Sequence, residues 1–460
     1  MRDTLESAID QMQQAGADYA DIRYERFTTS KAEIKDQKVE ELSRGEDRGV
    51  GVRALYDGAW GFSATTDIDE LDTAAEQAVR SAKALHKYGS VDAFDLDTAS
   101  RVETTLDQRA EMTPGMMRDE QRLAILEDAE RAMRFHSDTI KSARVVYTDA
   151  EGQYMFVNSD GSFIERQPTH YALYCYATAR KNDRVETYSE RSASATGLEQ
   201  FHEDDPVNMG KKAAEMAEKI VDAPRAPQGK MPVVIGDKLG GLFAHEAVGH
   251  AAEADQVLAD DSIFAGRKGE TIASEHVSVI DDPTLSGKHG SYRYDDEGQQ
   301  ARKTMILKNG VLNGFLHSRE TATRMGAEPT GNGRAEAFST RPVVRMSNTF
   351  FDTGDSSKQE MIEEIDDGLY LKGFKGGQVA TAEGNFTFGT THAYRIIDGE
   401  VADIVRGPSI SGSTLHVLEE IDLVGDDLEI GDPGYCGKNG QTVYVDTGSP
   451  HMRVREMVVG

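Results

Sequence analysis

Apolar and polar residues alternate with two different periods along the N-terminal half of the chain. Apolar residues three and four positions apart predict a first helix that ends at Gly16 and two more over about residues 69–86 and 118–134. Alternation with period two predicts a run of short strands over residues 19–64 and a long strand at residues 171–177. The turn signals within the first run are residues 43–45 and 57–58.

A segment that contains proline and glycine, residues 223–229, predicts a linker between two domains. The first domain, residues 1–225, combines antiparallel strands with helices, and the second, residues 226–460, is strand-rich and carries the histidine-bearing helix that follows its first strand. In that strand, residues 231–236, Pro232 should take the first position or an edge, because proline has no N–H to donate. The predicted fold class is α+β. Hairpin turns are expected at Asn309-Gly310 and Asp398-Gly399.

The helix that follows this strand contains the pattern His-Glu-x-x-x-His, formed by His245, Glu246 and His250. In the familiar zinc-peptidase pattern the histidines are four residues apart, about 40° around a regular helix. Here they are five apart, or about 140°, so a regular helix could not direct both rings at one metal ion. Either a π-bulge restores the alignment, or Gly249 ends or bends the helix. A histidine that only satisfies a core hydrogen bond is the competing interpretation.

A catalytic zinc ion needs a third protein ligand and an open position for water. Cys436 lies in a glycine-rich segment that can turn tightly and bring its thiol close to another part of the chain. Cys175 lies in an alternating strand, where a small buried core residue is expected. Glu246 would then serve as the general base that takes a proton from the attacking water. The alternative is a structural metal in a non-catalytic peptide-binding or assembly subunit.

The segment His245–His250 and the five residues after it resemble the metal-site helix of the TldD/PmbA family of metallopeptidases. The resemblance covers most of residues 230–460, whereas the N-terminal half resembles the family only in its pattern. Further similar segments follow in order at residues 295–298, 309–317, 330–334, 341–349, 436–441 and 448–450.

This family contains subunits that carry the metal site and subunits that lack it, and the chain is similar to the metal-bearing TldD type. The resemblance implies that His245, His250 and Cys436 are the Zn²⁺ ligands and that Glu246 is the catalytic base. It also implies a peptidase that cleaves peptides or unfolded protein segments. A dimer is expected, in which the partner could be a metal-free homologous subunit.

The balance of charged residues limits the kinds of partner that are expected. The chain has 51 Lys and Arg residues and 80 Asp and Glu residues, which give a net charge of −29. This excess argues against nucleic acid and anionic membranes as partners. The acidic residues are dispersed along the chain, as in salt-adapted proteins, although an ordinary acidic enzyme is the alternative. Apolar runs are too short to span a bilayer, so no membrane-spanning segment is expected. The first residues do not have the pattern of a secretory signal, and two cysteines are too few for a disulfide framework. We therefore expect a soluble cytoplasmic protein.

Four further polar residues have two possible roles each. Glu253 and Asp255 could orient a metal ligand or could be solvated helix residues. Arg345 and Asn348 could hold the substrate or stabilise an oxyanion, or could form a structural ion pair or strand-end cap.

Overall fold

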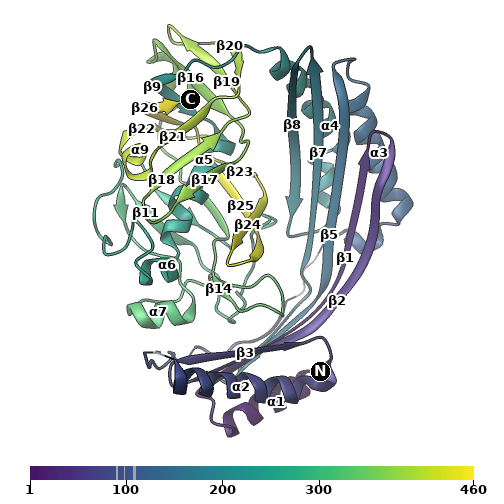
Figure 1. Cartoon of the computed structure of the whole chain (residues 1–460), viewed down its shortest axis with the longest axis vertical. Helices are drawn as coiled ribbons and strands as arrows, with labels where there is room; N and C mark the ends of the chain where they lie inside the picture. Colours follow the sequence, from purple (N-terminus) through teal and green to yellow (C-terminus); the bar gives the residue numbers. More distant parts are fainter. Residues whose placement is uncertain (90–91, 98, 107–109) are drawn as a thin grey trace.

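The computed structural model describes residues 1–89, 92–97, 99–106 and 110–460. Among these residues the N-terminal part forms an eight-stranded, mainly antiparallel sheet whose long strands curve past the rest of the molecule (Figure 1). The strand order is β3-β2-β1-β5-β6-β4, and β7 pairs with both β5 and β8. The strands are β1 (Tyr19–Lys35), β2 (Lys38–Tyr56), β3 (Ala59–Thr65), β4 (Glu103–Leu106), β5 (Ile140–Asn158), β6 (Phe163–Arg166), β7 (Thr169–Lys181) and β8 (Arg184–Ser194).

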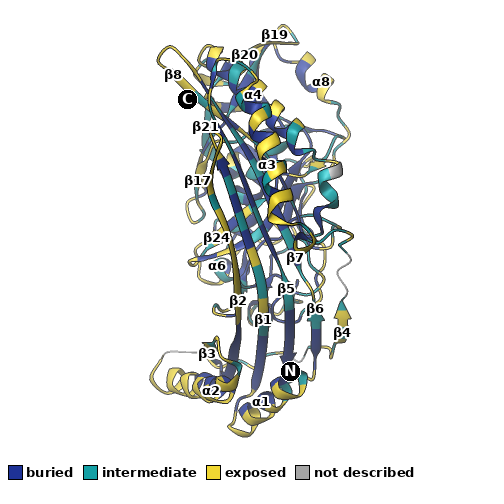
Figure 2. Ribbon diagram, turned by 90° about the vertical axis from the view of Figure 1, so that its right-hand side faces the viewer, coloured by how far each residue is buried: buried dark blue, intermediate teal, exposed yellow. Residues whose placement is uncertain are grey.

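Two pairs of helices cover separate parts of this sheet. The apolar faces of α1 (Arg2–Gln14) and α2 (Leu71–Tyr88) pack on one end, around β1, β2 and the end of β5. The apolar faces of α3 (Asp119–Arg134) and α4 (Pro206–Asp222) pack on β5 and β7 at the other end. Figure 2 shows that much of the outer surface of α3 and α4 is exposed. The predicted helices are confirmed, because one apolar stripe on each is sufficient to bury it against the sheet.

The first two strands are longer than the sequence predicted. β1 and β2 form one continuous hairpin whose turn is made by Asp36 and Gln37, with φ of 49° and 68°. The predicted turn at residues 43–45 is wrong, because these residues lie inside β2 and pair with β1 without interruption. The predicted turn at Asp57-Gly58 is confirmed by the short connection between β2 and β3.

The C-terminal part contains two further large sheets among the described residues. The nine-stranded sheet follows the order β17-β18-β21-β26-β9-β16-β19-β20, with β22 on β26, and the seven-stranded sheet follows β12-β11-β10-β15-β25-β23, with β24 on β25. The first consists of β9 (Gly229–Ile235), β16 (Asp367–Lys372), β17 (Gly377–Ala380), β18 (Asn385–Gly389), β19 (His392–Ile397), β20 (Glu400–Arg406), β21 (Ser409–Ser413), β22 (Ile421–Val424) and β26 (Met452–Val459). The second consists of β10 (Val279–Asp281), β11 (Thr304–Lys308), β12 (Val311–Leu312), β15 (Asn348–Phe351), β23 (Glu429–Ile430), β24 (Gly434–Lys438) and β25 (Gln441–Ser449). A separate pair, β13 (Gly333–Arg334) and β14 (Val343–Val344), and the helices α6 (Ala254–Leu258), α7 (Arg319–Met325), α8 (Lys358–Glu363) and α9 (Thr414–Glu420) complete this part.

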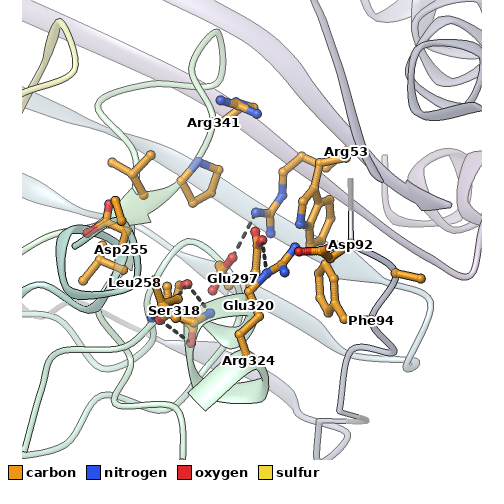
Figure 3. A pocket seen from close by; sticks show the side chains of 17 residues that line it. Arg53, Asp92, Phe94, Asp255, Leu258, Glu297, Ser318, Glu320, Arg324 and Arg341 are labelled. Carbon is orange, nitrogen blue, oxygen red and sulfur yellow. Dashed lines mark hydrogen bonds and ion pairs between the residues drawn. The ribbon is translucent and has the colours of Figure 1, made fainter. Parts of the chain in front are cut away.

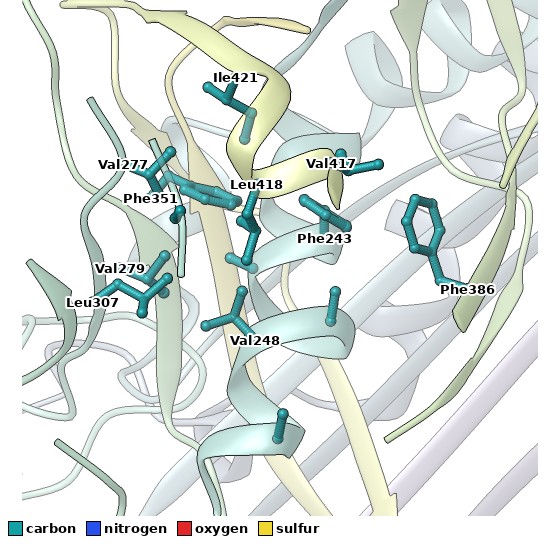
Figure 4. Packing of buried hydrophobic residues seen from close by; sticks show 14 of the residues in the cluster. Phe243, Val248, Val277, Val279, Leu307, Phe351, Phe386, Val417, Leu418 and Ile421 are labelled. Carbon is teal, nitrogen blue, oxygen red and sulfur yellow. The ribbon is translucent and has the colours of Figure 1, made fainter. Parts of the chain in front are cut away.

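The helix α5 (Asp237–Phe243) lies in the main core between these two sheets (Figure 4). Its Phe243 ring stacks at 6.1 Å on Phe351 of the seven-stranded sheet and lies 5.2 Å from Phe386 of the nine-stranded sheet. Contact with both sheets holds the helix and the residues that follow it in a fixed position. The fold class predicted from the sequence, α+β, is confirmed.

Pro232 lies in the middle of β9, a central strand, so its predicted place at a strand start or edge is wrong. The pairing of β9 with β26 shifts register between Val454 and Met457, next to the position of Pro232. A bulge of this kind tolerates a residue that has no N–H to donate. The hairpin turns predicted at Asn309-Gly310 and Asp398-Gly399 are confirmed, each with positive φ at both residues.

Ion pairs between buried or half-buried side chains join the N-terminal sheet to the C-terminal part. Arg53 of β2 contacts Glu297 at 2.9 Å, and Arg166 of β6 contacts Asp296 at 2.7 Å. These ion pairs help to hold the C-terminal part against the concave side of the N-terminal sheet (Figure 1). The domain boundary between residues 225 and 226 stays a prediction.

Candidate metal centre

The two histidines of the His-Glu-x-x-x-His pattern lie on a π-helical turn. After α5 the chain forms the π-helical turn η4 (Ala244–Gly249) and then the 3₁₀ turn η5 (His250–Ala252). The N–H of His250 donates to the carbonyl of His245, five residues earlier, so residues five apart lie on the same side of this turn. The two imidazole rings lie edge to face, with their centroids 5.1 Å apart. Of the two distortions considered from the sequence, the π-bulge is the one observed.

Gly249 remains helical and serves the packing of this turn. Its φ of −61° and ψ of −52° are ordinary helical values. A Cβ atom added at Gly249 would lie 2.0 Å from Sδ of Met346, so only glycine allows this close approach.

Cys436 of β24 completes a cluster of three potential metal ligands. Its Sγ lies 3.5 Å from Nε2 of His250, and one ligand atom from each of His245, His250 and Cys436 falls within 4.8 Å of the others. Burial raises the pKa of the Cys436 thiol, but the charge and hydrogen bonds of the two histidines outweigh burial and bring the pKa to about 5. Cys175, in contrast, is a fully buried core residue of β7, and burial raises its pKa to about 12.

A buried carboxylate orients His250. Nδ1 of His250 lies 2.9 Å from Oε2 of Glu253, which leaves Nε2 directed toward Cys436. Burial lowers the pKa of His250, but the charge of Glu253 and the contact with Cys436 hold it well above its usual value. Glu253 is fully buried. The orienting role considered for Glu253 from the sequence is therefore the one its position supports.

Lys438 links the strand that carries Cys436 to this carboxylate. Its Nζ lies 3.1 Å from Glu253, 2.8 Å from Asp255 and 3.0 Å from the carbonyl oxygen of Val344. Burial raises the pKa of Asp255, and the charge of Lys438 opposes that effect. We call Lys438, Glu253 and Asp255 the lysine clamp. The sequence analysis missed Lys438, because nothing in a single lysine after a glycine indicates which carboxylate it contacts.

Arg345 and Asn348 are buried structural residues. Arg345 donates hydrogen bonds to the carbonyl oxygens of Cys436 and Gln441, and so supports both strands of the β24–β25 hairpin. The side-chain amide of Asn348 donates to the Asp282 carbonyl at 2.6 Å, at the start of β15. Their full burial in these contacts argues against an oxyanion role for either.

Glu246 lies on the same turn, directly after His245, and is partly exposed. Burial lowers the pKa of His245, but the charge and hydrogen bond of Cys436, with a smaller contribution from the charge of Glu246, raise it above its usual value. Within the described part of the chain the side chain of Glu246 has no hydrogen-bond or ion-pair partner. A free carboxylate next to the ligand cluster can accept a proton.

A cavity of about 750 Å³ lies next to the lysine clamp (Figure 3). Asp255 and Val344, both of which contact Lys438, form part of its wall, and Arg53 and Glu297 form the wall toward the N-terminal sheet. His245, His250 and Cys436 do not line this cavity.

The fold and the ligand cluster are typical of a metallopeptidase with a His-Glu-x-x-x-His helix. Residues 228–460 match the family model described as the PmbA/TldA metallopeptidase C-terminal domain. Residues 20–82 match domain 1 of the same family, and residues 113–220 match its central domain. The chain belongs to the TldD/PmbA family of metallopeptidases.

Similarity to individual relatives extends over almost the whole chain. A metalloprotease of Methanothermobacter thermautotrophicus is 40% identical over 443 residues, which cover 96% of this chain and 95% of that protein. A protein of Saccharolobus solfataricus named zinc metalloprotease TldD homolog is 29% identical, with 98% of both chains covered. The crystal structure of TldE from Thermococcus kodakarensis has the same fold, with a TM-score of 0.77 at 19% identity over 99% of this chain and all of that one. None of the helices in the described part of the chain combines the length and the apolar composition that a membrane-spanning helix needs.

Proposed function

We propose that this protein is a zinc-dependent peptidase that hydrolyses peptides or unfolded protein segments. The observation that carries the proposal is the cluster of His245, His250 and Cys436, whose ligand atoms lie within 4.8 Å of one another. Two imidazoles and a thiol with a low pKa are ligands that Zn²⁺ prefers.

When bound, zinc supplies a Lewis acid that polarises the scissile carbonyl and lowers the pKa of water. The protein's own residues supply the rest of the chemistry. Glu246 accepts the proton of the attacking water and passes it to the leaving amine. Glu253 holds His250 in the orientation in which Nε2 points toward Cys436 and would be available to the metal. These roles of His245, His250, Cys436 and Glu246 are our proposal.

The alternative is a peptide-binding or assembly subunit with a structural metal. Structural zinc sites have four protein ligands. Among the described residues, no fourth histidine, cysteine, aspartate or glutamate joins the cluster. Three ligands leave a position open for water, which favours catalysis over a structural role.

The variant Glu246→Gln tests this mechanism. It should retain zinc and fold, and should lose at least about 100-fold in kcat on unfolded casein, because the amide cannot accept the proton. The matched control is Glu76→Gln on the exposed face of α2, which should leave kcat unchanged. Chelator should abolish the wild-type activity. Wild-type rates for Glu246→Gln, or full activity after zinc removal, would refute the mechanism.

The proposal also covers assembly and location. We infer that the protein works as a dimer in the cytoplasm, with a second copy or with a metal-free homologous subunit. The support for pairing is the resemblance to a family that contains both metal-bearing and metal-free subunits. Sedimentation of the purified protein, alone and with a homologous subunit that lacks the histidines, distinguishes the two assemblies.

A further inference from the structure

A second cavity lies on the opposite side of the hairpin that carries Cys436. Its volume is about 470 Å³, and it is lined by strands of the N-terminal sheet and by the β24–β25 hairpin. The sheet contributes residues of β1, β2, β5 and β7, among them Ser30, Ser43 and His170, and the hairpin contributes Tyr435 and Tyr444. This volume is large enough for a ligand group of moderate size.

The hairpin presents different chemistry on its two faces. Cys436 and Val443 are opposite each other and buried, and the neighbouring pair Tyr435 and Tyr444 points to the other face because side chains alternate along a strand. The Tyr444 ring stacks on His170 at 4.0 Å, and its centroid lies 5.5 Å from that of Tyr435. Tyr435 remains 46% exposed, although it is a large aromatic residue. The cavity therefore has an aromatic wall with an accessible ring.

The charged residues of the cavity are already paired, with one exception. Glu41 contacts Lys31 at 2.6 Å, and Asp149 contacts Arg122 at 3.1 Å. Arg44 is exposed, and its guanidinium has no ion-pair partner among the described residues. With no free carboxylate to pair with a cation, the cavity does not suit a cationic group, and its aromatic wall suits an aromatic one. Arg44 can donate hydrogen bonds to the carbonyl oxygens of a polypeptide that carries this group.

The edge of β24 that faces away from β25 is where a peptide could pass from this cavity toward Cys436. In the described part of the chain, β24 pairs with no strand other than β25, so its other edge takes part in no sheet. A Cβ atom added at Gly437, on the same face as Tyr435, would meet nothing within 4 Å. The two faces of the hairpin are on the order of 10 Å apart, which an extended peptide that passes round the edge covers in about three to five residues.

We propose that this cavity is an exosite, in which an uncharged aromatic side chain of a polypeptide substrate stacks against Tyr435 about three to five residues from the scissile bond. The exosite rests on the proposed peptidase function, because its ligand is part of the peptide that the proposed active site would cleave. The expected ligand of the exosite is a peptide that carries phenylalanine, tyrosine or tryptophan about three to five residues from the scissile bond.

The test uses two peptides that differ only in having phenylalanine or alanine in this interval. KM should be about fivefold lower for the phenylalanine peptide with wild-type protein. Tyr435→Ala should remove this difference, and Ser43→Trp, which fills the cavity from β2 without changing the hairpin, should also remove it. Tyr88→Ala, which truncates an 80% exposed tyrosine on α2, should preserve it. Bound zinc is measured in each variant, to show that the neighbouring Cys436 is undisturbed.

Binding of the same labelled peptides to Glu246→Gln protein, followed by fluorescence anisotropy, separates the exosite from the proposed function. A preference for phenylalanine that Tyr435→Ala removes supports the exosite even if no peptide is cleaved. Hydrolysis with the same preference in Tyr435→Ala and Ser43→Trp overturns the exosite and leaves the peptidase intact. A change in sedimentation of Tyr435→Ala without a change in peptide preference also overturns it, and identifies the cavity as a subunit contact.

Discussion

Lys438→Met is expected to weaken zinc binding although Lys438 is not a ligand. The lysine clamp connects β24, which carries Cys436, to Glu253, which orients His250. The substitution removes the contacts of 3.1 Å to Glu253 and 2.8 Å to Asp255 and leaves Glu253 fully buried with fewer partners. Breaking a buried ion pair from one side costs about 3–5 kcal/mol. We expect a cost at the lower end of this range, because the Asp255 side chain is 31% exposed and can be solvated by water.

Loss of a group that positions a metal ligand typically reduces metal affinity by about 10- to 100-fold, or about 1.4–2.7 kcal/mol. We therefore expect the zinc Kd of Lys438→Met to rise within this range, measured by competition with a chromophoric chelator. The free energy of unfolding of the zinc-free protein should fall by about 3 kcal/mol in denaturant titrations.

The matched control is Lys230→Met, which removes an exposed ion pair with Glu456 at 2.7 Å. An exposed pair contributes about 0–1 kcal/mol, so both the stability and the zinc Kd should stay close to wild type. An unchanged zinc Kd in Lys438→Met, together with a loss of stability, would show that the clamp supports only the fold. If neither quantity changed, the clamp would have no energetic role.

Three further predictions concern the metal and the charged surface. Cys436→Ser should lose zinc on dialysis, whereas Cys175→Ser should retain it, and equal retention would exclude Cys436 as a ligand. The zinc-free site holds the pKa values of His245 and His250 above their usual value, so protons compete with zinc there. Zinc affinity should fall as the pH drops through the raised pKa values of the two histidines. Cys436, with a pKa of about 5, should add to this loss of affinity only at lower pH. A zinc affinity that is independent of pH between 5 and 8 would contradict the prediction. With a net charge of −29, the protein should unfold at a higher temperature in molar KCl than in dilute buffer, and equal melting temperatures would exclude salt adaptation.

Local features of this protein could be derived from the sequence by itself. Helices α2 and α3 follow from one apolar stripe each, and the turns at Asn309-Gly310 and Asp398-Gly399 follow from residues that accept positive φ. The spacing of His245 and His250 also shows that a regular helix is impossible, because that geometry depends only on neighbouring residues. Such features depend on interactions between residues close together in the chain.

Only the tertiary structure decided which distant residues meet. Cys436 reaches His250 across 186 positions, and Lys438 reaches Glu253 across 185, because the order of strands places β24 beside the π-helical turn. The order of strands also extends β2 through residues 43–45, where local turn signals are overridden by continuous pairing with β1. Pro232 is accommodated within a central strand by the same kind of long-range pairing. Periodicity reports which face of an element is apolar, but the partner of that face depends on the free energy of the whole assembled core.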